Sequence, residues 1–110
     1  MGEYNYNTIK NAVFEWHSKL NLKSVQHKEI KENDSLIIDF EFKNCIAQLS
    51  VTEGDYRPYR FVYFEAMNIN TDYLNHPYCE PVYSVYDTKN MNINDVLSML
   101  DKALEFCANF

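Results

Sequence analysis

The sequence predicts a two-layer α+β sandwich made of an N-terminal helix, an antiparallel sheet of four to five strands and a C-terminal helix. We expect one domain over residues 1–110. Apolar residues recur at helical spacing near both ends of the chain and at every second position across its middle. Short turn sequences separate the central runs, and short turns join antiparallel neighbours. Two amphipathic helices can therefore cover the apolar face of a half-wet sheet.

The first helix is expected over residues 6–21. Its apolar positions are spaced by three or four residues, which aligns them on one face. That stripe comprises Ile9, Ala12, Val13, Trp16 and Leu20. Asn5 or Asn7 can cap the start of the helix, and Asn21 can end it. We expect His17 to be a half-exposed residue of this helix.

The first strands are expected at 23–31, 35–43 and 45–52. The first of these is polar and suits a sheet edge. Inward positions of the other two are Leu36, Ile38, Phe40, Phe42, Cys45, Ala47, Leu49 and Val51. Asp39 and Glu41 point to the opposite, wet face, and Lys43 and Asn44 form the hairpin turn between the two strands.

The strand expected at 59–67 is apolar on both faces. Tyr59, Phe61, Tyr63 and Glu65 alternate on one side, and Val62, Phe64 and Ala66 on the other. The carboxylate of Glu65 marks its own side as the exposed one. A loop is expected at 68–79, and a last strand runs from Pro81 to about Tyr86.

The final helix is expected from Ile93 to about Ala108. Asn92 suits its N-cap, and Asp95 at the third helical position favours the helix dipole. Met91 and Val96 occupy the positions of a hydrophobic staple. The buried stripe comprises Ile93, Val96, Leu97, Leu100, Leu104 and Cys107.

Charge narrows the class of partner. Ten basic residues stand against sixteen acidic ones, a net charge of −6, and Arg57 and Arg60 are the only arginines. Such a chain repels phosphate backbones, so we expect no direct nucleic-acid binding and instead a basic protein partner. The apolar runs are too short for a membrane span, and we expect no secretory signal. The odd set of three cysteines predicts reduced thiols and a cytoplasmic protein.

Enzyme chemistry is poorly represented. With two glycines there is no Gly-rich phosphate loop, and the sequence has no nucleophile-elbow or zinc-binding motif. His76 and Cys79 lie three apart, but a zinc site needs three or four ligands. Asp39 and Glu41, about 7 Å apart on one strand, could form a hydrolytic pair but suit a solvated strand face better. We therefore expect no catalytic residues, no cofactor and no metal.

Tyrosine is the feature that stands out. Seven of the nine tyrosines fall within residues 56–86, interleaved with acidic residues. Tyrosine favours strands, which explains the cluster structurally, but it is also enriched at binding surfaces. On the second interpretation the protein is a non-enzymatic binding module that inhibits a basic protein. It would share its size, charge and layout with toxin-immunity proteins and phage inhibitors of host defence, although no motif assigns a family. The predicted protein-binding residues are Tyr59, Phe61, Tyr63, Glu65, Asp39, Glu41, Tyr73 and Tyr78.

Two alternatives stay open at this point. The exposed strand face or the edge strand could pair two copies into a homodimeric scaffold. A pocket between the helices and the sheet could instead bind a small ligand.

Overall fold

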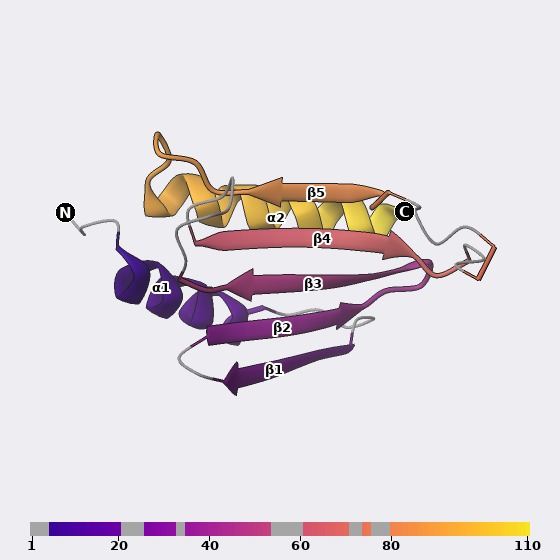
Figure 1. Ribbon diagram of the computed structural model, residues 1–110, viewed down its shortest axis with the longest axis horizontal. Coiled ribbons are helices and arrows are strands. Elements are labelled where there is room, and N and C mark those ends of the chain that lie inside the picture. The colour runs from indigo at the N-terminus through magenta and orange to yellow at the C-terminus, as the bar shows by residue number, and fades with distance from the viewer. Residues whose placement is uncertain (1–4, 21–25, 33–34, 54–60, 71–73, 76–79) are drawn as a thin grey trace.

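The computed structural model describes residues 5–20, 35–53, 61–70, 74–75 and 80–110 with their side chains, and residues 26–32 by their backbone. Its elements are α1 (Tyr6–Ser18), β1 (Gln26–Glu32), β2 (Ser35–Glu41), β3 (Cys45–Val51), β4 (Val62–Asn68), β5 (Tyr83–Tyr86) and α2 (Ile93–Asn109). The order of helix, strands and helix confirms the predicted α+β class (Figure 1).

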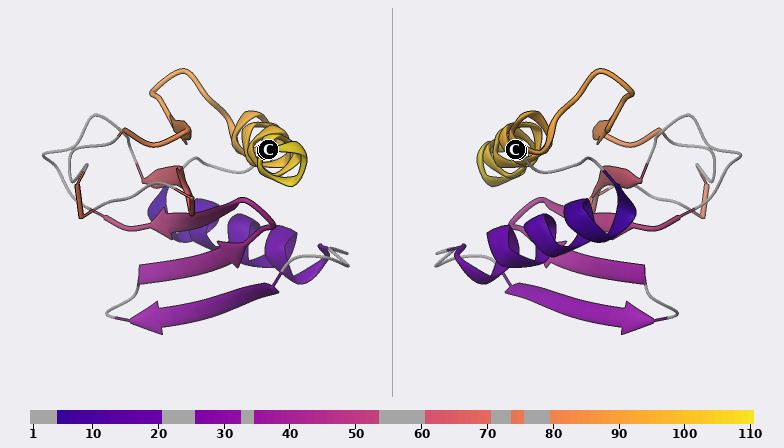
Figure 2. Two further views of the ribbon diagram at one scale, coloured as in Figure 1. Left: turned by 90° about the vertical axis from the view of Figure 1, so that its right-hand side faces the viewer. Right: turned by 90° about the vertical axis from the view of Figure 1, so that its left-hand side faces the viewer.

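The five strands form one antiparallel meander in the order β1-β2-β3-β4-β5. Each strand pairs with its neighbour in sequence, as the short connections between β1, β2 and β3 require. Both helices lie on one side of this sheet, behind the strands in the view of Figure 1, and Figure 2 shows the two layers from each end. The molecule is therefore a two-layer sandwich with one helix-covered face.

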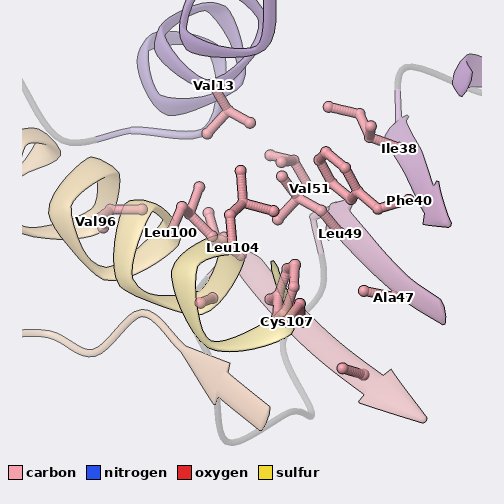
Figure 3. Packing of buried hydrophobic residues seen from close by; sticks show 14 of the residues in the cluster. Val13, Ile38, Phe40, Ala47, Leu49, Val51, Val96, Leu100, Leu104 and Cys107 are labelled. Carbon is pink, nitrogen blue, oxygen red and sulfur yellow. The ribbon is translucent and has the colours of Figure 1, made fainter. Parts of the chain in front are cut away.

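The core lies between the helices and the covered face of the sheet (Figure 3). The strands contribute Leu36, Ile38, Phe40, Phe42, Cys45, Ala47, Leu49, Val51, Val62, Phe64 and Ala66, and the helices contribute Ile9, Val13, Val96, Leu100, Ala103, Leu104 and Cys107. Every inward strand position predicted from the two-residue alternation is among them. Burying such side chains is the dominant stabilising term for the domain.

Helix α1 is shorter and rotated compared with the prediction. Asn5 is its N-cap and accepts a hydrogen bond from the backbone N–H of Thr8 at 2.9 Å. The helix ends at Ser18 rather than near Asn21, because the N–H groups of Lys19 and Leu20 close turn-like bonds to the carbonyls of residues 16 and 17. Residue 21 itself lies outside the described residues.

The rotation of α1 corrects the prediction for His17. This side chain is only 7% exposed, and its ring meets the ring of Phe40 edge-on, with centroids 6.1 Å apart. Ile9, Val13 and His17 follow one another at four-residue spacing and form the buried line, while Trp16 is half-buried. The prediction left the imidazole of His17 outside the buried stripe, because only apolar residues were counted as buried. In the structure the polar His17 continues the buried line of Ile9 and Val13.

Helix α2 follows its prediction closely. Asn92 and Asp95 form a complete capping box, in which each side chain accepts a hydrogen bond from the backbone N–H of the other residue. The half-buried Met91 and the buried Val96 both join the core, as a hydrophobic staple requires. The indole Nε1 of Trp16 donates to the carboxylate of Asp101 at 2.8 Å and ties α1 to α2.

Strand bounds differ by a few residues from those expected, and one buried carboxylate lies at such a boundary. Regular pairing of β4 starts at Val62. At the start of β4, the backbone N–H groups of Phe61 and Val62 donate hydrogen bonds of 2.9–3.0 Å to the fully buried carboxylate of Asp87. The expected strand residues 59 and 60 lie outside the described residues.

Candidate functional site

The second face of the sheet carries side chains that the helices do not cover. We call it the open face and define it on β2 to β5 by the outward positions Ile37, Asp39, Glu41, Ile46, Gln48, Ser50, Tyr63, Glu65, Met67, Ser84 and Tyr86. Ile46 remains 48% exposed and Tyr86 39% exposed, which is high for apolar or aromatic strand residues. Figure 1 looks onto this face.

The register arranges the open face in rows that run across the strands. The central row is polar and consists of Asp39, Gln48, Glu65 and Ser84. A row on one side is mostly apolar and consists of Ile37, Ser50, Tyr63 and Tyr86. A row on the other side consists of Glu41, Ile46 and Met67.

Charge on the open face has one sign. Asp39, Glu41 and Glu65 are its charged residues, since no outward position of β2 to β5 holds a lysine or arginine. The register of β1 places Lys28 opposite Asp39, at the margin of this surface. The face therefore presents three carboxylates among aromatic and aliphatic groups.

Hydrogen bonds within the face orient two of these carboxylates. Gln48 donates its amide to Asp39 at 3.0 Å, and the Tyr63 hydroxyl donates to Glu65 at 2.8 Å. Each carboxylate has two oxygens with about four acceptor sites in all, so one such bond leaves capacity for an incoming donor. The arrangement can hold acceptors in place for a cationic group.

Comparison of the chain with protein-family models, curated proteins and solved structures found no match.

The predicted binding residues divide into three groups. Tyr63, Glu65, Asp39 and Glu41 share the open face, within three neighbouring strands. Phe61 does not join them, and its expected place beside Tyr63 was wrong. Its ring packs against Tyr6 of α1, with centroids 5.8 Å apart, because the residue precedes the regular pleat of β4. Predicted positions that lie outside the described residues are Tyr59, Tyr73 and Tyr78.

Seven residues of the open face, Ile46, Met67 and Tyr86 among them, were not predicted binding residues. Ile46 and Met67 lie opposite each other on β3 and β4, and Tyr86 lies opposite Tyr63. A signal for Ile46 was present in the sequence, since it is an isoleucine at an outward position of an alternating strand. Met67 continues the alternation of Tyr63 and Glu65, whereas the place of Tyr86 beside Tyr63 depends on the strand order.

A shallow groove lies between the two helices, on the other side of the molecule. Its lining residues are Ala12, Glu15, Trp16, Lys19, Leu20, Leu97 and Asp101. The polar groups there are engaged with one another, since Lys19 forms a salt bridge to Glu15 at 3.1 Å and Trp16 donates to Asp101. A ligand site usually offers convergent polar groups in a concave apolar pocket, and this groove is open.

The two described cysteines are structural. Cys45 on β3 and Cys107 on α2 are free, buried thiols, and the Cys45 Sγ lies 3.8 Å from the Cys107 carbonyl oxygen. Burial raises the pKa of the Cys107 thiol to about 12, and the neighbouring Cys45 adds to the rise. Burial also raises the pKa of Cys45. Both groups therefore stay protonated and are poor nucleophiles.

The described part of the chain has neither a cluster of metal ligands nor a helix that could span a membrane. No group of three or more histidine, cysteine, aspartate or glutamate side chains there is placed to hold a metal ion. Neither α1 nor α2 is long and apolar enough to cross a membrane. His76 and Cys79, the pair weighed for zinc, lie outside the described residues.

Proposed function

We propose that this protein is a non-enzymatic binding module that docks a basic protein partner on the open face of its sheet and acts as an inhibitor by covering the partner's basic surface. The supporting observation is the composition of that face: aromatic and aliphatic side chains set around Asp39, Glu41 and Glu65, with no cation at an outward position of β2 to β5. Complementary charge steers association and suppresses wrong partners.

Anchor residues in this proposal are Tyr63 and Tyr86. Tyrosine contributes a large contact area at low rotamer cost and is enriched among the residues that dominate binding energy. Tyr63 is half-buried and Tyr86 is 39% exposed, so each still has surface to lose on docking. Ile46, at 48% exposed, adds an aliphatic contact on the other side of the polar row.

The same charges disfavour self-association through this face. A symmetric dimer presents one patch to itself. Its three carboxylates would then be brought close to those of the second copy, and like-charge contacts across an interface are costly. The buried free thiols Cys45 and Cys107 suit a reducing compartment, and we propose a cytoplasmic location.

The test compares three baits in a lysate of the native cell: the wild type, the face variant Tyr63→Ala/Glu65→Lys, and the control Phe106→Ala/Glu105→Lys. The control makes the same pair of changes on α2, where Phe106 is 37% exposed and Glu105 is exposed. Circular dichroism checks that both variants fold.

We expect a basic protein that the wild type and the control retain and the face variant loses. With that partner purified, the face variant should bind at least about thirtyfold more weakly, the effect of losing a hot-spot residue. Equal retention by all three baits, or no protein that prefers the wild type over the face variant, would overturn the proposal.

A further inference from the structure

We propose that the element received by the open face is an amphipathic α-helix that lies across the strands and carries two cations one heptad apart with apolar residues between them. This inference rests on the proposed function, because it specifies the shape of the basic partner. It is drawn from the row pattern of the open face, in which polar and apolar side chains are sorted across the strands rather than along them.

The spacing of the two carboxylates in the central row matches a helix. Asp39 and Glu65 lie on β2 and β4, two strands apart, which is about 10 Å at the spacing of neighbouring strands. Residues i and i+7 of a helix point the same way and are also about 10 Å apart along its axis. A helix across the sheet can therefore bring one lysine or arginine to each carboxylate.

The flanking rows match the same helix. They lie about 7 Å to either side of the polar row, the distance between alternate residues of a strand. Residues i+3 and i+4 project to the two sides of the line that joins i and i+7, and they fall midway between them along the axis. One would reach the row of Ile37, Tyr63 and Tyr86, and the other the pair Ile46 and Met67.

Other placements fit the rows less well. A segment lying parallel to β4 would contact Tyr63, Glu65 and Met67 in turn. Any one face of that segment would then need both apolar and basic residues. A second copy of this chain offers carboxylates where cations are needed. The pattern that matches is basic at i and i+7 and apolar at i+3 and i+4.

The test uses two synthetic peptides of equal composition, each about four turns in length if helical. The helix-patterned peptide has lysine at i and i+7 and leucine at i+3 and i+4 in an alanine and glutamine background. The strand-patterned peptide has the same lysines and leucines in alternation. Binding to the full chain is measured by fluorescence anisotropy, and peptide helicity by circular dichroism on titration.

We expect the helix-patterned peptide to bind at least about tenfold more tightly than the strand-patterned one and to gain helicity on binding. Asp39→Lys/Glu65→Lys should weaken its binding at least about tenfold, whereas the control Glu15→Lys/Glu105→Lys, on the two helices, should not. If the reversal variant does not fold, Asp39→Asn/Glu65→Gln keeps the hydrogen-bond acceptors and should still weaken binding.

Equal or tighter binding of the strand-patterned peptide would overturn the helix assignment. Unchanged binding of the helix-patterned peptide to both Asp39→Lys/Glu65→Lys and Asp39→Asn/Glu65→Gln would overturn it as well. So would failure of both peptides to bind. In each of these cases a native partner that is still lost by Tyr63→Ala/Glu65→Lys would leave the proposed function standing. A native partner indifferent to that variant would end both proposals.

Discussion

At the scale of single residues, Asp87 is the side chain whose role is most sharply defined. It is a fully buried carboxylate, and it accepts hydrogen bonds from two successive backbone N–H groups where β4 begins. Its own N–H donates to the carbonyl of Val62 at 3.2 Å. Asp87 therefore fixes the start of the strand that carries Tyr63 and Glu65 onto the open face.

Replacing Asp87 should cost stability out of proportion to its size. Asp87→Ala leaves the N–H groups of Phe61 and Val62 without this acceptor, and the unfolding free energy should fall by roughly 2–3 kcal/mol. Asp87→Asn keeps one acceptor oxygen and should lose less. Urea unfolding measures both, with Glu53→Ala, an exposed acidic position, as the control within about 0.5 kcal/mol of the wild type. Wild-type stability of Asp87→Ala would contradict this role.

The sequence could not reveal Asp87 in this role. The stretch 87–90 has turn composition, and turn residues are ordinarily exposed. The partners of this carboxylate, the N–H groups of residues 61 and 62, are 25 or more positions away in the chain, so the local sequence gives no sign of its burial. His17 was misplaced for a related reason, since its burial depends on the ring of Phe40 rather than on its neighbours in α1.

At the scale of elements, the sequence was most informative where periodicity was strong. The alternation at 35–51 correctly separated the covered face from the outward side chains, and Asn92 and Asp95 correctly marked the start of α2. Ends of elements were less predictable, as in α1, because they depend on local bonds that several adjacent residues could form. Strand order, which brings Tyr86 beside Tyr63, needed the three-dimensional structure.

The capping box of α2 gives a prediction at this scale. Asn92→Ala removes the acceptor for the N–H of Asp95, and the unfolding free energy should fall by about 1 kcal/mol. Asn92→Ser keeps a capping oxygen and should stay close to the wild type. Asn94→Ala makes the same substitution at an exposed position two residues further along the chain, and it serves as the control in the same urea experiment. A loss at Asn94 equal to that at Asn92 would argue against a specific cap.

At the scale of the whole molecule, the two layers separate two tasks. The helices and the covered face of the sheet hold the hydrophobic core, so side chains on the open face can vary without emptying it. The predicted binding residues included four of these outward residues, Asp39, Glu41, Tyr63 and Glu65, but they also included Phe61. Phe61 instead packs against Tyr6 at the margin of the core.

The net charge of −6 and the one-sign open face predict how fast a basic partner associates. Long-range attraction raises the association rate and is screened by salt, whereas contacts in the docked complex govern dissociation. The association rate should fall about tenfold or more between about 50 and about 500 mM NaCl, with a smaller change in the dissociation rate. Surface plasmon resonance with the captured partner measures both rates.

The variant Asp39→Asn/Glu41→Gln should associate more slowly at low salt, and its association rate should depend less on salt. The control Glu15→Gln/Glu105→Gln removes the same charge from the helices and should retain more of the salt dependence. An association rate indifferent to salt, or equally affected by both neutral pairs, would mean that the carboxylates of the open face do not steer the partner.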